Sequence, residues 1–335
     1  MTRLPQAFDA WENVALGLPK LLASDHSRRT IADLPPFPSD QITNDRERER
    51  AMTLLSYLGH AYVWRGGKPA ETLPARIAVP WHAVAQSLGR PPVLSYSSYS
   101  LHNYYRFDPQ REIECGNIAL VQNFLGGLDE EWFILIHVDI ERKAGPGLAA
   151  LHPALDAAGS KDADRLEQHL AAIQSSIEAM YATLRRMTEW CDPYIYYHRV
   201  RPYIHGWKNH PDLPKGLVYE GVDEYGGQPQ QFRGETGAQS AIIPALDAVL
   251  GVGHKEDLLR TYLMEMRNYM PPDQRAFIAS LEERGSLRPF VQQCDNARLT
   301  ELYNACVEGV ERFRTLHLEY AASYIFKQAQ TDAKN

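Results

Sequence analysis

The sequence has few cysteines, no excess of basic residues and no long apolar run. Its four cysteines, spread over 335 residues without a C-x-x-C pair, argue against a disulfide or zinc framework. Lys plus Arg total 35 against 42 for Asp plus Glu, so the net charge is −7 and nothing indicates nucleic-acid binding. No stretch reaches about 18 unbroken apolar residues, and the N-terminus lacks a signal-peptide pattern. We expect a cytoplasmic protein that binds neither nucleic acid nor membrane.

Several catalytic motifs are also missing from the sequence. It contains no G-x-x-x-x-G-K-[ST], no H-E-x-x-H and no G-x-S-x-G. Gly251-Val252-Gly253 begins a dinucleotide-binding pattern, but Glu256 stands where that pattern needs glycine, and no predicted strand precedes it. Phosphate-binding loops, zinc peptidases and serine hydrolases are therefore poor matches.

What the sequence does contain is helical periodicity. Apolar residues recur every three or four positions over 45–64 and 162–190, each with one apolar stripe. Further helices are predicted over residues 11–22, 81–88, 239–251, 256–270, 273–283 and 298–328. Three prolines within 34–38 predict a loop, and 206–238 is a long loop-rich stretch of the kind that is usually functional. The fold class is therefore predominantly α-helical.

Two segments remain open to two interpretations each. The apolar run 132–138 fits a buried strand or a buried helix, because periodicity alone does not separate them. Residues 96–105 are dense in tyrosine and small polar residues. They fit a half-buried surface helix or loop, or one wall of a pocket for a flat aromatic ligand.

Two charged or titratable side chains of the last predicted helix face its apolar side. His317 shares that face with Phe313 and Tyr320, so it is either a structural histidine of the core or a metal ligand, as in helical haem proteins. Arg314 lies one turn earlier and would be costly there without an anion. A haem propionate and Asp247 are the two candidate partners.

A second histidine and an arginine also stand among apolar or aromatic neighbours. His137 lies in the apolar run, where a histidine bonded to backbone is the simpler interpretation. Arg201 follows a tyrosine-rich segment and precedes the long loop. An arginine between aromatic walls suits bidentate capture of a carboxylate, whereas a solvated surface arginine is the alternative.

In these residues and in several longer segments, the chain resembles the indoleamine 2,3-dioxygenase family. The resemblance is specific from about residue 196 to 326 and weaker between 91 and 141. It is carried by the segments RPYIHGWK (201–208), GLVYEG (216–221), GAQS (237–240), DAVLG (247–251), MRNYMPP (266–272) and RTLHL (314–318).

The resemblance implies an all-α, two-domain fold. A smaller N-terminal domain, residues 1–122, would form the distal pocket wall, and a larger helical domain, residues 123–335, would bind haem b between the two. The activity implied is a haem-dependent dioxygenation. Both atoms of O2 would enter the indole C2–C3 bond of L-tryptophan or a close relative, giving N-formylkynurenine. An electron donor, which the sequence does not identify, would keep the iron reduced.

The family's functional residues carry over by position. His317 matches the iron ligand, Arg314 the arginine near a haem propionate and Asp247 its acidic partner. Arg201 matches the residue that binds the substrate carboxylate. The residues that match the pocket around the indole are Tyr96, Tyr99, Phe133 and Tyr196. Those that match a loop closing over the substrate are Gly234, Glu235, Thr236 and Gly237.

The chain departs from the family pattern at two positions. His137 stands where the mammalian enzymes have a distal serine and where the related tryptophan 2,3-dioxygenases have a histidine, so it is expected to orient the indole N–H or O2. Glu235 stands where glycine is expected. Two other functions therefore stay open: a haem monooxygenase or biosynthetic enzyme on a modified indole, and a non-catalytic haem or O2-binding protein.

Overall fold

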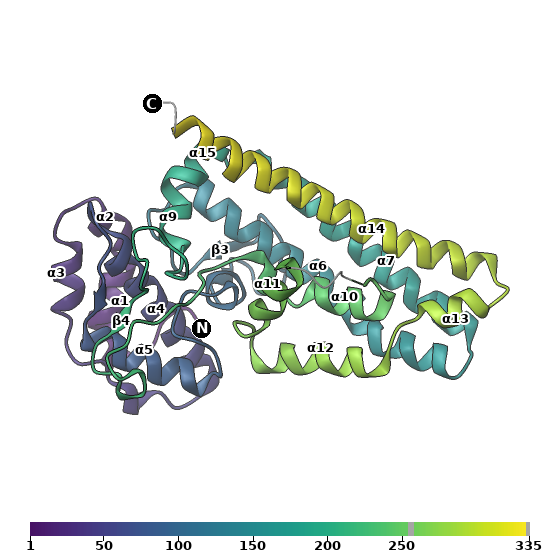
Figure 1. The fold of residues 1–335 in the computed structure, drawn as a ribbon, viewed down its shortest axis with the longest axis horizontal. Helices are drawn as coiled ribbons and strands as arrows, with labels where there is room; N and C mark the ends of the chain where they lie inside the picture. Colours follow the sequence, from purple (N-terminus) through teal and green to yellow (C-terminus); the bar gives the residue numbers. More distant parts are fainter. Residues whose placement is uncertain (254–257, 333–335) are drawn as a thin grey trace.

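The computed structural model describes residues 1–253 and 258–332, whose regular structure is almost entirely helical (Figure 1). The smaller lobe contains α1 (Asp9–Leu16), α2 (Leu18–Leu22), α3 (Ser27–Ala32), α4 (Asp45–Trp64) and α5 (Ala75–Ser87). The larger lobe contains α6 (Leu128–Gly159), α7 (Ala163–Arg185), α8 (Pro193–Ile195), α9 (Arg201–Ile204), α10 (Ile242–Leu250), α11 (Leu258–Arg267), α12 (Pro272–Arg284), α13 (Arg288–Gln293), α14 (Ala297–Ala321) and α15 (Lys327–Asp332). The predicted all-α class is confirmed.

The strands of the described residues are short and form two-stranded sheets. β1 (Thr72–Leu73) runs parallel to β4 (Val218–Tyr219), with Thr72 opposite Val218. β2 (Tyr104–Arg106) runs antiparallel to β3 (Ile118–Leu120), with Tyr104 opposite Leu120.

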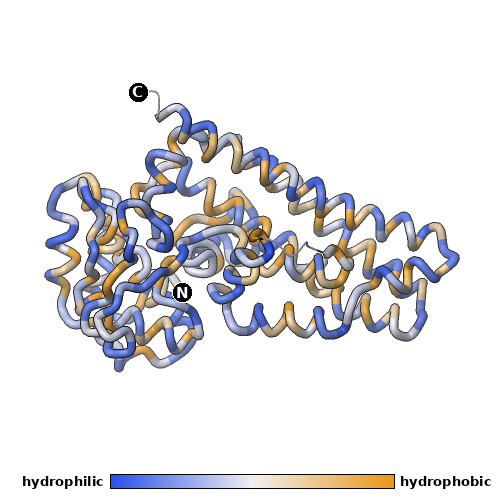
Figure 2. Tube along the Cα trace, in the orientation of Figure 1, coloured by the Kyte–Doolittle hydropathy of each residue, from blue (hydrophilic) through white to orange (hydrophobic). Residues whose placement is uncertain are grey.

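The larger lobe is built around α7, which packs along both α6 and α14 (Figure 1). The predicted apolar stripe of α7 is buried, and it includes Leu166, Leu170 and Ile173. Asp162 caps the helix, since its side chain accepts a hydrogen bond from the amide of Arg165 at 3.0 Å. Figure 2 shows apolar residues along the inner sides of these helices and polar residues outside.

The structure settles the open interpretation of 132–138, which is helical and lies near the start of α6. α5 begins at Ala75, whereas the prediction began at residue 81. Pro80 stands inside this helix, which extends further towards the N-terminus than the prediction did.

Other boundaries differ in smaller ways. The helix predicted over 11–22 is divided at Gly17, and the one predicted over 298–328 becomes α14, a π-helical turn (Ala322–Phe326) and α15. The start of the helix predicted over 256–270 lies outside the described residues, as does Glu256. α3, α8, α9 and α13 were not predicted, nor was the part of α6 that follows residue 138. The irregular character of 206–238 is confirmed, since it holds only β4 and two short 3-10 turns.

The long loop returns to the smaller lobe. The Trp64 indole N–H donates to the His205 carbonyl at 2.8 Å, and His60 Nδ1 lies 2.8 Å from the Tyr203 carbonyl oxygen. Residues after 122 therefore complete the smaller lobe, and the domain boundary at residue 122 stays a prediction. None of the helices formed by the described residues is long and apolar enough to cross a membrane.

Candidate functional site

Five predicted pocket residues lie together between the two lobes. The ring centres of Phe133 and Tyr196 are 4.6 Å apart, and those of Phe133 and His137 are 4.7 Å apart. The ring centre of Tyr96 lies 5.9 Å from that of His137, and the ring centre of Tyr99 lies 6.3 Å from that of Phe133. Tyr96 and Tyr99 are buried, so the interpretation of 96–105 as a half-buried surface segment is wrong for these two side chains.

Three π-helical turns help to build this aromatic pocket. They span Ser97–Leu101, Tyr196–Val200 and Ala322–Phe326. Such turns insert an extra residue into a helix and are frequent at functional sites. The third brings Tyr324 to 5.6 Å from Tyr196, a contact that sequence reasoning missed.

His137 has a defined hydrogen-bonding role. Its Nδ1 lies 2.7 Å from the carbonyl oxygen of Phe133, one turn earlier on α6. Burial lowers its pKa to about 4, so the ring is neutral near pH 7. A carbonyl oxygen only accepts hydrogen bonds, so the ring proton is on Nδ1, and Nε2 carries a lone pair. The expectation of a histidine bonded to backbone is therefore correct, and Nε2 remains available as an acceptor.

Glu141 holds two parts of the pocket together and was not among the predicted site residues. Its Oε1 accepts hydrogen bonds from the Tyr96 hydroxyl at 2.9 Å and from the Ser240 hydroxyl at 2.6 Å. The backbone amide of Tyr96 also donates to the Gln239 side chain at 2.8 Å. Burial raises the pKa of Glu141, while the two hydroxyl donors oppose that shift. The available signal was spacing, because Glu141 lies one turn beyond His137 on α6.

The segment 233–237 passes close to the end of α9. A Cβ added to Gly234 would lie 2.1 Å from the Ile204 carbonyl oxygen and 2.2 Å from the Gly206 nitrogen, so only glycine fits. The amide of Glu235 donates to the Ile204 carbonyl at 3.1 Å. Thr236 caps the following short turn by accepting from the Ala238 amide at 3.4 Å. The segment is therefore fastened to α9 by its backbone.

Glu235 places a carboxyl group beside the aromatic pocket. Its charge contributes to raising the pKa values of the Tyr96, Tyr99 and Tyr196 phenols, all of which are shifted mainly by burial. Burial raises the pKa of Glu235 itself to about 8. Among the residues that the structure describes, its carboxyl has no hydrogen-bond or ion-pair partner.

Arg201, the first residue of α9, is half-buried beside the same pocket. Its guanidinium carbon lies 5.3 Å from the centre of the Tyr197 ring, a cation–π distance. Its charge contributes to lowering the pKa of the nearby His205, which burial alone already depresses. No carboxylate of residues 1–253 or 258–332 forms an ion pair with it.

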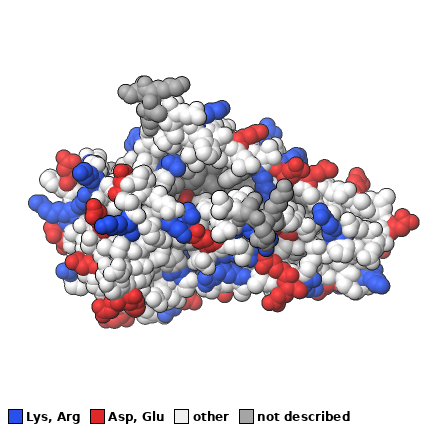
Figure 3. All heavy atoms as spheres, in the orientation of Figure 1, with Lys and Arg blue, Asp and Glu red and all other residues white. Residues whose placement is uncertain are grey.

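His317 lies on the other side of this region, on α14. A Cβ added to Gly237 would be 3.9 Å from its Nε2. His317 is close enough to His137 to contribute to lowering that residue's pKa. Its own side chain is solvent-accessible, and yet desolvation lowers its pKa. Figure 3 shows a hollow near the middle of one face of the molecule, in the region where Figure 1 draws α6.

Arg314, one turn before His317, forms an ion pair with Asp247 on α10. Of the two partners considered for this arginine, the acidic side chain is therefore present. The pair fixes the guanidinium between α10 and α14, close to the histidine.

The donor set around His317 fits a haem. Within the described part of the chain, no three His, Cys, Asp or Glu side chains converge as a metal site. A single histidine is, however, the protein ligand that haem iron requires, because the porphyrin supplies the other donors. Among the described residues, neither ring nitrogen of His317 has a hydrogen-bond partner, which leaves Nε2 free to bind iron.

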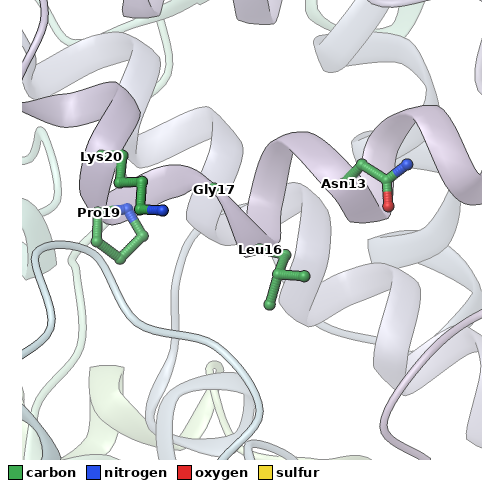
Figure 4. A pocket seen from close by; sticks show the side chains of 5 residues that line it. All are labelled: Asn13, Leu16, Gly17, Pro19 and Lys20. Carbon is green, nitrogen blue, oxygen red and sulfur yellow. The ribbon is translucent and has the colours of Figure 1, made fainter.

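A separate surface pocket of about 330 Å³ lies between α1 and α2 (Figure 4). It is lined by Asn13, Leu16, Gly17, Pro19 and Lys20. None of these is a predicted site residue, and the pocket offers no histidine or aromatic group.

The helical fold and the accessible histidine behind an aromatic pocket place the protein in the class of helical proteins that are able to hold a haem. The comparison with protein families is more specific. The model of the family "Indoleamine 2,3-dioxygenase" matches residues 1–335. The chain belongs to this family and is an oxidoreductase of the dioxygenase type.

Its relatives share about a third of its residues. It is 35% identical to indoleamine 2,3-dioxygenase 1 of Rattus norvegicus over 98% of this chain and 81% of that protein. It is 34% identical to indoleamine 2,3-dioxygenase of Saccharomyces cerevisiae, over 97% of this chain and 76% of that protein. It is 31% identical to a protein of Fusarium equiseti named 6-hydroxytryptophan 2,3-dioxygenase, over 97% of this chain and 80% of that protein.

Proposed function

We propose that this chain is a haem-dependent dioxygenase that inserts both atoms of O2 across the indole C2–C3 bond of L-tryptophan, giving N-formylkynurenine. The observation that carries the proposal is the arrangement in the aromatic pocket. His137 offers an acceptor nitrogen there, and Arg201 offers a guanidinium without an ion-pair partner in the described structure.

His317 would bind the haem iron through Nε2, and the paired Arg314 and Asp247 would lie near the propionates. When bound, the haem supplies the binding and activation of O2. The protein's own contribution is to bind and orient the indole and to keep water away from it.

Three kinds of contact would orient the substrate. Arg201 would bind the carboxylate through two parallel N–H···O hydrogen bonds. The rings of Phe133 and Tyr196 would pack against the indole plane. His137 Nε2, which only accepts in the neutral ring, would receive the indole N–H. This assignment favours an N–H donor over O2 as the partner of His137.

The first experiment is the absorbance spectrum of the reduced, haem-loaded protein before and after L-tryptophan is added. We expect a haem band that shifts with tryptophan and a product heavier than the substrate by two oxygen atoms. A product that gains one oxygen atom would support a monooxygenase instead. Reversible O2 binding without any tryptophan effect would support a non-catalytic haem protein.

A ring-hydroxylated tryptophan is the second candidate substrate. One relative is named for such a substrate, and Glu235 places a carboxyl group beside the pocket that accepts the ring. Competition between L-tryptophan and 6-hydroxytryptophan for turnover separates the two candidates.

A further inference from the structure

Glu235 has a fixed backbone and a side chain with no assigned role. Its amide is bonded to the Ile204 carbonyl at 3.1 Å. The preceding Gly234 packs against the backbone of Ile204 and Gly206 too closely for any Cβ. The backbone therefore has little freedom, and the direction in which the Glu235 side chain leaves it is set by this packing.

The surroundings of the Glu235 carboxyl are aromatic. Its charge contributes to the raised pKa values of Tyr57, Tyr96, Tyr99 and Tyr196, which places it within electrostatic reach of all four phenols. The side chain is half-buried, and no donor in the described structure satisfies it. A carboxylate in such surroundings is costly unless a ligand supplies a positive charge or an N–H donor.

Arg201, on α9, presents a positive charge. It lies three residues before Ile204, the residue whose carbonyl holds the Glu235 amide. Arg201 and Glu235 both act on the pKa of Tyr196, in opposite directions. The site thus holds one guanidinium and one carboxyl group that have no ion-pair partner among the described residues. The ligand that satisfies both is a zwitterion, which carries a carboxylate and an ammonium on one carbon.

We propose that Glu235 binds the α-ammonium group of the substrate while Arg201 binds its carboxylate, so that the pocket selects indole amino acids over indole acids. This inference rests on the proposed function and makes the substrate class more specific. A glycine, which the family pattern would have here, has no side chain to make the contact. Glu235 is thus a specificity-determining residue of this chain.

The test measures binding by isothermal titration calorimetry of the haem-loaded protein under argon, so that no turnover occurs. The ligands are L-tryptophan, tryptamine, which lacks the carboxylate, and indole-3-propionate, which lacks the ammonium. In Glu235→Gln we expect Kd for L-tryptophan and tryptamine to rise about 10-fold or more, as for a lost charged hydrogen bond. Kd for indole-3-propionate should stay unchanged or fall.

Two further variants make the result specific. Glu224→Gln removes a carboxylate of the same loop-rich segment whose side chain is 62% exposed, and it should leave all three Kd values unchanged. Glu235→Asp keeps the charge and should lose less affinity for L-tryptophan than Glu235→Gln. Thermal unfolding checks that each variant is folded.

Several outcomes would overturn the inference. Equal losses for all three ligands in Glu235→Gln would show a structural role, and an unchanged Kd for L-tryptophan would show none. With 6-hydroxytryptophan titrated as a fourth ligand, a loss confined to it would assign Glu235 to the ring hydroxyl instead. Failure of the wild-type protein to bind L-tryptophan at all would overturn the proposed function, and this inference with it.

Discussion

The Nδ1 atom of His137 lies 2.7 Å from the carbonyl oxygen of Phe133, and this one contact determines which nitrogen faces the pocket as an acceptor. We expect His137→Ser to reduce the preference for L-tryptophan over 1-methyltryptophan, because the methylated nitrogen has no proton to donate. The preference, measured as a ratio of kcat/KM values, should fall about 10-fold, which corresponds to one hydrogen bond.

His152, on the same helix, provides the control for His137. It lies 3.0 Å from the Ser280 hydroxyl and takes no part in the pocket. His152→Ala should leave the ratio unchanged. If His137→Ser also leaves it unchanged, His137 does not bond the indole nitrogen.

His317→Ala should lose haem. Nε2 is the only protein donor that we assign to the iron, so its removal leaves the porphyrin held by packing and by its propionates alone. The measurement is haem absorbance per chain after reconstitution with hemin and gel filtration. His26→Ala, a change at an exposed histidine, should keep full occupancy. Full occupancy with normal turnover in His317→Ala would remove this residue from the iron site.

Arg201→Leu should raise KM for L-tryptophan about 10- to 100-fold, the range for removing one partner of a desolvated charge pair. KM for tryptamine should change much less, since that analogue has no carboxylate to bind. Arg199→Leu, two residues earlier and exposed, serves as the matched control. Equal effects on both substrates would mean that Arg201 does not bind the carboxylate.

Local sequence patterns predicted several of the longer helices, because periodicity depends only on near neighbours, but they missed most of α6. The stripe through Leu166 and Leu170 placed α7 to within a few residues. The start of α5 was predicted at residue 81, whereas the helix begins at Ala75 and contains Pro80.

The site required more than local patterns. Helical spacing singled out His317 and Arg314 and left a haem propionate or Asp247 as the partner of the arginine. The family resemblance implied their roles, and the structure then paired Arg314 with Asp247. Glu141 was missed because its partners, Tyr96 and Ser240, are 45 and 99 residues away in the sequence. Contacts of this kind leave no periodic signal, so only the folded chain shows them.

Gly234→Ala should destabilise the protein and weaken substrate binding. The new Cβ would lie 2.1 Å from the Ile204 carbonyl oxygen, so the segment must move away from α9 and carry Glu235 with it. Gly67→Ala, where nothing lies within 4 Å, is the matched control. Thermal unfolding and calorimetric Kd for L-tryptophan measure the two effects. A Tm and a Kd equal to those of the control would show that the segment is not fastened as described.

The raised pKa of Glu235 predicts a stability change that needs neither haem nor substrate. Its folded-state pKa is about 8, above the ordinary value of 4.5, because burial disfavours the charged form. The folded protein therefore has its full stability with respect to this group below pH about 4.5. It loses stability as the pH rises through about 8, because the buried carboxyl must then ionise. Gln resembles the protonated carboxyl, so Glu235→Gln should match the wild-type Tm at pH 4 and exceed it progressively towards pH 8.

Neighbouring groups do not titrate in a way that hides this difference. The phenols of Tyr96, Tyr99 and Tyr196 have pKa values raised by burial and stay neutral, and His137 is neutral above pH about 4. Glu130, whose pKa burial raises to about 7, titrates in both proteins and cancels in the comparison. Thermal unfolding of apo wild type and Glu235→Gln from pH 4 to pH 9 measures the difference. A constant difference in Tm would mean that the Glu235 carboxyl is hydrated rather than buried, and that substrate would gain no advantage from satisfying it.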